Sequence, residues 1–121
     1  MRQFGSREAA IMDVLWSRDG SMTVRDMLDV LHNDRPLAYT TVMTVLDNLH
    51  RKGWLRRERD GRAYRYAPVM SRDAYTADMM TQMLSGSPDP GAVFLRLVSQ
   101  LSTEETVQLR AALRGTPRDA P

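Results

Sequence analysis

The sequence predicts a mainly α-helical protein with a small β-hairpin, arranged as a winged helix-turn-helix domain followed by a C-terminal helical region. Amphipathic stripes at residues 24–31 and 42–49 indicate packed helices. Asp60-Gly61 between two β-like segments indicates a tight hairpin, and further helical segments follow Pro68. We therefore expect the winged-helix domain at residues 1–70, the helical region at 71–114 and a disordered tail at 115–121.

The first two predicted helices each begin at a capping residue and end at turn-forming residues. Ser6 is the expected N-cap of the first helix, which ends near Ser17. Thr23 is the expected N-cap of the second helix, and Asn33-Asp34-Arg35-Pro36 is expected to end it. The apolar residues of this second helix share one face: Val24, Met27, Leu28 and Leu31.

The third predicted helix runs from Ala38 to Lys52 and ends at Gly53, the residue type most often found after a helix. Its apolar face repeats the same spacing: Val42, Val45, Leu46 and Leu49. Two β-like segments follow at 54–59 and 62–67, and Asp60-Gly61 predicts a two-residue turn between them.

The remainder predicts three more helices. Ser71 caps one that ends near Leu84, and the Ser-, Gly- and Pro-rich residues 85–91 interrupt the chain. A fifth helix is marked by Phe94, Leu97, Val98 and Leu101. Ser102-Thr103-Glu104-Glu105 has the form of a capping box for a sixth helix, which ends near Leu113.

Composition excludes several classes of function. The chain has no cysteine, which excludes disulfides, thiol redox chemistry and cysteine-based metal sites. It also has no apolar run of membrane-spanning length and no signal peptide, which fits the cytoplasm. His32 and His50 are the only histidines and have no metal-ligand spacing, and Asp47 near His50 is interpreted as a surface pair. We expect neither an enzyme nor a metal or cofactor.

Charge is distributed unevenly along the chain. Residues 35–68 carry eight basic and three acidic side chains, a net charge of +5, whereas the remainder carries −3. A basic block of this kind is typical of a surface that binds a polyanion such as nucleic acid. The alternative is a solvated arginine face without a partner.

The side of the third helix opposite its apolar stripe is rich in threonine, a mediocre helix former. A threonine hydroxyl can contact phosphates or base edges, and its methyl group can contact thymine in the major groove. Tyr39 and the helix N-terminus can hold a phosphate. The predicted recognition residues are Tyr39, Thr40, Thr41, Met43 and Thr44, with Asn48 and Asp47 beside them. The alternative is that the threonines only cap and fill the first helical turn.

The hairpin supplies the second part of the predicted DNA-binding surface. The hairpin is the wing of the predicted fold. Contacts to the DNA backbone, from the wing and the end of the third helix, are expected from Arg51, Lys52, Arg59 and Arg62. The roles of Arg56 and Arg57 stay open. One strand face can seat Tyr64 and Tyr66 on the helices while the arginines reach out. The alternative is an edge hairpin that is charged to prevent aggregation. Trp54 and Trp16 are interpreted as packing residues.

The last helices have apolar faces but no obvious core of their own, so a second copy of the chain is the expected partner. A two-fold dimer would place two reading helices in successive major grooves and imply a palindromic site. The predicted dimerisation residues are Met79, Met80, Met83, Leu84, Phe94, Leu97, Val98 and Leu101. The alternative is packing of these helices on the winged-helix domain, the head, at residues 1–70.

Three segments resemble the penicillinase-repressor family, BlaI/MecI. They are Ala10-Ile11-Met12-Asp13-Val14-Leu15-Trp16, then the stretch from Leu37-Ala38-Tyr39-Thr40-Thr41 to Arg51-Lys52-Gly53-Trp54, and Arg65-Tyr66-Ala67-Pro68. The resemblance is specific over residues 6–68 and looser to about residue 113.

The resemblance implies a dimeric repressor of a palindromic operator, whose recognition-helix contacts fall on Thr40, Thr41, Met43 and Thr44. It also implies targets such as β-lactamase and penicillin-binding-protein genes. The family's partner is a membrane metalloprotease sensor whose signalling leads to cleavage of the repressor. Its best-known members are cut at an Asn-Phe bond, and the aligned pair in the possible cleavage region here is Arg96-Leu97. A copper-responsive branch uses C-terminal cysteines, which this chain lacks.

With an enzyme not expected, one alternative to a DNA-binding repressor is left, a winged-helix protein-interaction module without DNA readout. Salt dependence separates it from DNA binding, because only contacts to several phosphates weaken steeply with salt.

Overall fold

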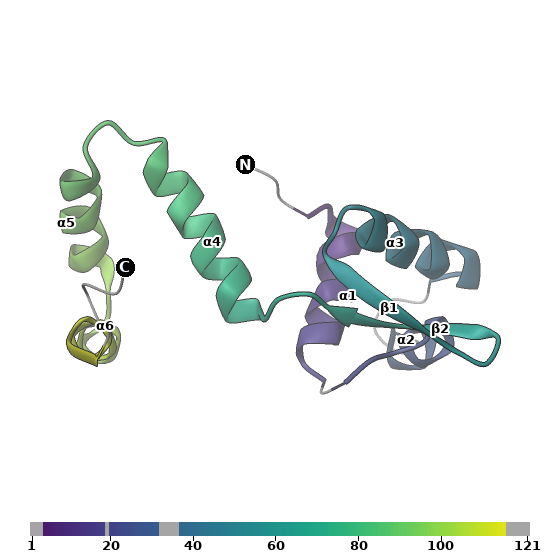
Figure 1. Ribbon diagram of the computed structural model, residues 1–121. Helices are drawn as coiled ribbons and strands as arrows, with labels where there is room; N and C mark the ends of the chain where they lie inside the picture. Colours follow the sequence, from purple (N-terminus) through teal and green to yellow (C-terminus); the bar gives the residue numbers. More distant parts are fainter. Residues whose placement is uncertain (1–3, 19, 32–36, 116–121) are drawn as a thin grey trace. The chain divides into compact units, whose positions relative to one another are not determined.

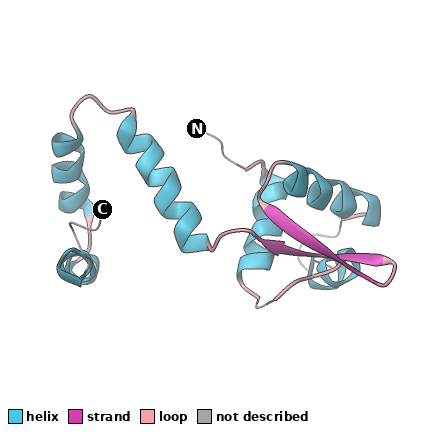
Figure 2. Cartoon of the chain, viewed as in Figure 1, coloured by secondary structure: helices cyan, strands magenta, loops and turns pink. Residues whose placement is uncertain are grey.

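The computed structural model describes residues 4–18, 20–31 and 37–115 of the chain. Six helices and one hairpin follow one another in the described part, in the predicted order (Figures 1 and 2). The elements are α1 (Ser6–Trp16), α2 (Val24–Leu31), α3 (Tyr39–Arg51), β1 (Leu55–Asp60), β2 (Ala63–Pro68), α4 (Arg72–Ser85), α5 (Pro90–Gln100) and α6 (Thr103–Gly115). The predicted turn at 33–36, His32 and the tail after Gly115 lie outside the described residues. Among the described helices, none is long and apolar enough to cross a membrane.

The caps of α1 and α2 show which residues start these helices. Gly5, and not Ser6 as predicted, is the N-cap of α1: its extended backbone precedes the helix, and its N–H donates to Glu8 Oε1 at 3.1 Å. Thr23 caps α2 as predicted. Its hydroxyl accepts from the Asp26 N–H at 3.0 Å, and its own N–H donates to Asp26 Oδ2 at 3.1 Å. This reciprocal pair is a capping box that the sequence prediction did not include.

The predicted apolar stripes of α2 and α3 form the core of the head together with α1 and the hairpin. The buried cluster comprises Ile11, Met12, Leu15, Met22, Val24, Met27, Leu31, Val42, Val45, Leu46, Leu49, Leu55 and Tyr66. Leu28 packs against this cluster while remaining partly exposed. Burial of one face of α3 leaves its opposite face available for contacts outside the core.

The hairpin has a one-residue difference from the predicted turn. Asp60 pairs with Ala63, so Gly61 and Arg62 form the two-residue loop, in place of Asp60-Gly61. Gly61 has φ +64°, and no described non-glycine residue has a positive φ. A glycine with positive φ followed by a residue with negative φ matches a type II′ turn, which accepts arginine at its second position. Arg62 therefore lies at the very tip of the hairpin, and Figure 1 shows this tip projecting past the helices.

An aromatic cluster joins the start of α4 to the head. The ring of Tyr75 stacks on Phe4 at 4.9 Å and lies 5.3 Å from both Trp16 and Trp54. The indole N–H of Trp16 donates to the Met70 carbonyl at 3.0 Å. Both tryptophans therefore have the packing role predicted for them.

The chain divides into two compact units, Met1–Met79 and Met80–Pro121, so the first part of α4 belongs with the head. In the second unit Asp89 caps α5, and its carboxylate accepts from the Ala92 N–H at 3.2 Å. The helix starts at Pro90, so the break expected at 85–91 is shorter than predicted, because proline is well suited to the first helical position. The predicted capping box of α6 is present, with reciprocal bonds between Ser102 and Glu105 of 2.9 and 3.0 Å.

Candidate nucleic-acid interface

The outward face of α3 is set by the burial of its other face. Val42 and Leu46 are fully buried, whereas Tyr39 and Met43 are 48% and 42% exposed. Thr44 is exposed as well. Because these positions follow helical spacing, the packing of the core places them on the face of α3 that points away from it.

A groove of about 630 Å³ runs between this face of α3 and the hairpin. It is lined by Thr23, Val24 and Arg25 of the α2 start, by Tyr39, Met43, Thr44, Asp47 and Arg51 of α3, and by Arg57, Arg62, Ala63, Tyr64 and Tyr66 of the hairpin. The structure thus brings three of the predicted recognition residues and two of the predicted wing residues to one surface. Four arginines and one aspartate give this lining a net positive charge.

The other predicted contact residues do not line the groove. Thr40 is exposed and Thr41 is only partly exposed, and both lie in the first turn of α3. Lys52 lies just beyond α3, where its ammonium pairs with Glu8 of α1 at 2.8 Å. Arg59 donates to the Tyr64 hydroxyl at 3.4 Å and lies over its ring at 5.4 Å.

Arg62 differs from the other arginines of the hairpin. Among the described residues, it has no hydrogen bond, ion pair or ring contact, and its side chain is exposed at the turn. The whole guanidinium is therefore available to a partner outside the chain. Arg51, in contrast, pairs with Asp47 at 3.3 Å and donates to Asn48 Oδ1 at 2.5 Å.

Arg57 is a groove residue whose role the sequence left open. Its guanidinium lies 4.1 Å from the centre of the Tyr64 ring and pairs with Asp47 Oδ1 at 3.2 Å. The pKa of Arg57 is raised above its ordinary value, mainly by a hydrogen bond with Tyr66 and further by Tyr64 and Asp47.

Arg57 and Arg59 lie on the same face of the hairpin as Tyr64 and Tyr66, because strand residues alternate between the two faces. The register pairs Arg57 with Tyr66 and Arg59 with Tyr64, and directly paired residues share a face of an antiparallel hairpin. Arg57 and Arg59 therefore lie on the same strand face as the tyrosines that were expected to pack on the helices. Of the two tyrosines only Tyr66 is buried, at 3% exposure, while Tyr64 is 36% exposed.

Sequence reasoning missed Arg25, the second residue of α2, which is exposed and lines the groove. Its only signal was a basic side chain on the polar face near a helix N-terminus, which predicts nothing without the tertiary arrangement.

The expected surface pair of Asp47 and His50 is not formed. Asp47 pairs with Arg51 and Arg57, and Nδ1 of His50 is buried without a hydrogen-bond partner in the described part of the chain.

The orientation of the hairpin is held by Arg65, on the face away from the tyrosines. Its guanidinium donates to the Ser21 hydroxyl and carbonyl, both at 2.9 Å, and pairs with Asp26 at 3.5 Å and Asp60 at 3.6 Å. Tyr66 also exchanges two backbone hydrogen bonds with Met22, of 2.8 and 2.9 Å. These contacts tie the hairpin to the start of α2, so the width of the groove is set by the fold.

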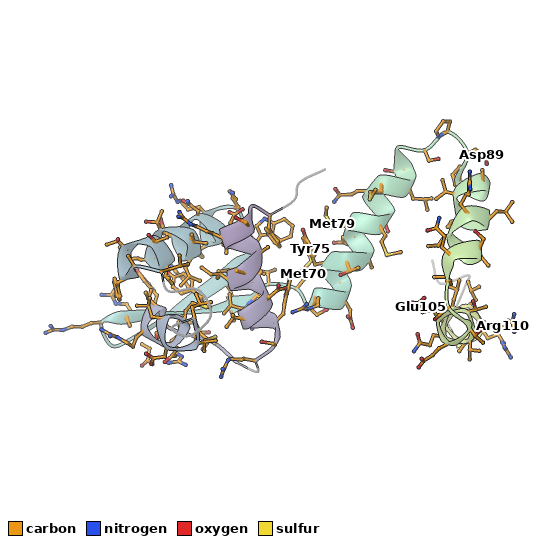
Figure 3. All side chains as sticks on the ribbon, turned by 180° about the vertical axis from the view of Figure 1, so that it is seen from behind. Met70, Tyr75, Met79, Asp89, Glu105 and Arg110 are labelled. Atoms are coloured by element: carbon orange, nitrogen blue, oxygen red, sulfur yellow. The ribbon has the colours of Figure 1, made fainter. Side chains whose placement is uncertain are left out.

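The helices after the hairpin present apolar side chains that a single chain leaves uncovered. No residue of α4, α5 or α6, all of them described, is buried. Met80, Met83, Phe94 and Val98 are 55%, 64%, 50% and 46% exposed, and the other predicted dimerisation residues are half-buried: Met79, Leu84, Leu97 and Leu101. Figure 3 labels Tyr75 and Met79 along α4, Asp89 at the start of α5, and Glu105 and Arg110 on α6.

Arg96 and Leu97, the pair aligned with the family's cleavage bond, lie inside α5. Arg96 is exposed and Leu97 is half-buried, and the Arg96 carbonyl accepts from the Ser99 hydroxyl at 2.7 Å.

A three-helix head with a basic hairpin beside an exposed helix face defines a winged helix-turn-helix transcription regulator. The penicillinase repressor model matches residues 4–115, so the chain belongs to the penicillinase repressor family. The members of this family are DNA-binding transcriptional repressors and not enzymes, which confirms the predicted class.

Individual relatives agree with this assignment. The transcriptional regulator BlaI of Mycobacterium tuberculosis is 42% identical over 116 residues, which are 93% of this chain and 84% of the relative. The solved DNA-binding domain of the repressor BlaI is 26% identical with a TM-score of 0.54, covering 60% of this chain and 88% of that one. MepR, a transcription regulator of the Staphylococcus aureus multidrug efflux pump MepA, is 27% identical with a TM-score of 0.51, covering 93% and 76%.

Proposed function

We propose that this chain represses transcription by binding a palindromic operator as a homodimer, with α3 in the major groove and the hairpin tip on the DNA backbone. The observation that carries this proposal is the common groove of α3 and the hairpin, where Met43 and Thr44 face the same space as Arg62. A helix and a projecting hairpin on one side of a head can contact one duplex together.

The division of labour follows from the chemistry of the residues. Thr44 and Met43 offer a hydroxyl and apolar atoms to base edges, and Tyr39 lies at the N-terminus of α3, where a phosphate is favoured. Arg62, at the hairpin turn, supplies a phosphate contact. Thr40, Thr41, Arg51, Lys52 and Arg59 stay proposed contacts around this centre.

Homodimerisation is supported by the uncovered apolar side chains of α4, α5 and α6. Apolar area left in water costs about 25 cal/mol for each Å², so covering these side chains with a second copy stabilises the pair. A two-fold arrangement also explains how two heads read one palindrome. We place the protein in the cytoplasm, where its DNA lies.

The signal proposed for this repressor is cleavage through a membrane metalloprotease sensor, with β-lactamase or other cell-wall and antibiotic-response genes as targets. This part rests on membership of the family. The Arg96–Leu97 bond lies within α5, so a protease can reach an extended substrate only after local unfolding of that helix.

Selection of duplexes from a random-sequence library by the purified protein tests the proposal directly. We expect enrichment of a palindrome with half-sites about one helical turn, 10 to 10.5 bp, apart or a multiple of it, bound with a steep salt dependence. Binding of no duplex at low ionic strength would overturn the proposed function and favour the protein-interaction alternative. Bound sites that have no two-fold symmetry would overturn the dimeric part.

A further inference from the structure

Asp47 is the only acidic residue among the described residues that line the groove. It lies on α3 one turn after Met43, on the side that the proposed function places against DNA. A carboxylate in this position repels phosphates and lowers the affinity for any duplex. A positively charged groove that serves only to bind phosphate would gain affinity if this carboxylate were removed.

Both carboxylate oxygens of Asp47 are engaged with arginines that also line the groove. Oδ2 pairs with Arg51 at 3.3 Å, and Oδ1 pairs with Arg57 at 3.2 Å. Arg57 is held further by the face of Tyr64 at 4.1 Å. Two of the four groove arginines are thus partly neutralised and directed toward α3, whereas Arg62 has no such partner in the described chain.

We propose that Asp47 is a specificity-determining residue. It repels phosphates and retains Arg51 and Arg57, so that tight binding depends on the base contacts of α3. Specificity is a difference between two affinities, and a group that weakens binding to every sequence increases that difference when correct base contacts compensate for it. This inference rests on the proposed function, because it assumes that the groove receives DNA.

A different role for Asp47 would be direct reading, since an aspartate can accept a hydrogen bond from the amino group of cytosine. The two roles predict different results for Asp47→Asn. If the carboxylate of Asp47 contacts a base, the variant loses affinity for the operator and keeps its affinity for other DNA. If the carboxylate repels phosphates and holds Arg51 and Arg57, the variant gains affinity for other DNA.

The test compares the wild type with Asp47→Asn, which has nearly the same shape and removes one negative charge. The probes are a duplex enriched by the wild-type protein from a random library and a shuffled duplex of the same composition, measured by fluorescence anisotropy over a range of salt concentrations. We expect affinity for the shuffled duplex to rise about three- to tenfold at low salt, with a salt slope steeper by about 0.9 for each additional phosphate that the variant neutralises. The preference for the enriched duplex should fall by a similar factor.

Glu58→Gln is the matched control, because it removes one carboxylate from the hairpin on the face opposite the groove, where Glu58 lies across from Arg65 in the strand register. It should change the shuffled-duplex affinity much less than Asp47→Asn does. The double variant Asp47→Asn/Arg57→Gln should show a smaller rise in affinity than Asp47→Asn alone, because the freed guanidinium is absent. Circular dichroism checks that each variant is folded.

An unchanged or lowered affinity of Asp47→Asn for the shuffled duplex overturns the assignment, as does an equal rise in Glu58→Gln. If the wild type binds neither duplex, the proposed function itself fails. These outcomes are distinguishable because the wild-type measurement precedes those on the variants.

Discussion

Replacing Arg62 with alanine separates phosphate binding from the reading of bases. Arg62 occupies the hairpin turn and makes no hydrogen bond or ion pair within the described chain, so its removal breaks no internal interaction there. We expect the free energy of unfolding of Arg62→Ala to match that of the wild type. Its DNA affinity should fall on all sequences alike, since a phosphate contact carries no base information.

The size of the effect follows from the removal of one phosphate interaction per head. Each such interaction adds about 0.9 to the slope of log affinity against log salt, so a rise from about 50 to about 200 mM salt changes its contribution about 3.5-fold. The ratio of wild-type to variant affinity should therefore shrink about 3.5-fold over that range for each phosphate that the variant no longer neutralises. Arg51 would give a less clear result, because its substitution also breaks the pair with Asp47.

Electrophoretic or anisotropy titrations at several salt concentrations, on enriched and shuffled duplexes, measure these quantities. Arg56→Ala is the control. Arg56 belongs to the same hairpin but lies on the face opposite Tyr64 and Tyr66, does not line the groove, and donates to the Pro68 carbonyl at 3.0 Å. The reasoning is refuted if Arg62→Ala leaves the salt slope unchanged, or if Arg56→Ala flattens it equally.

Three further predictions concern reading, assembly and stability. Thr44→Ala should lose about 1–3 kcal/mol of binding on the enriched duplex and almost nothing on the shuffled one, as titrations would show, whereas equal losses on both would contradict base reading. Met83→Glu should shift sedimentation toward the monomer, because it places a charge on a proposed dimer contact that is 64% exposed in the single chain. The neighbouring Gln82→Glu should leave the dimer intact, and dimers of both variants would count against this interface. Leu46→Ala should lower the free energy of unfolding by about 2–5 kcal/mol in urea denaturation, because Leu46 is fully buried. If Leu109→Ala, at a site 37% exposed, lowers the free energy of unfolding as much, the placement of the core is contradicted.

The regular elements of the head could be predicted because their signals are local. The stripes of α2 and α3 have helical spacing, Thr23 and Ser71 are capping residues, and Gly53 with φ +91° ends α3 as its position predicts. The errors were also local and small. Gly5 replaces Ser6 as N-cap because Glu8 closes the first turn onto its N–H, and the hairpin turn moves by one residue because the strand register pairs Asp60 with Ala63.

The candidate site was only partly predictable. Residue type and charge pointed to Met43, Thr44 and Arg62, because a polar helix face and a basic turn are visible in one segment each. Arg25 belongs to a different helix, and nothing local marks it as a groove residue. The pairing of Asp47 with Arg57 joins α3 to β1 and depends on the angle at which they pack.

The sequence by itself determined the order of helices and strands, the apolar faces of α2 and α3 and the basic character of residues 35–68, since periodicity and charge are properties of neighbouring residues. Only the tertiary structure decided that Arg57 is held by Asp47 and Arg65 by Asp26, because these contacts join residues of different elements. It also assigned the first part of α4 to the head, through rings contributed by Phe4, Trp16, Trp54 and Tyr75, which lie far apart along the chain.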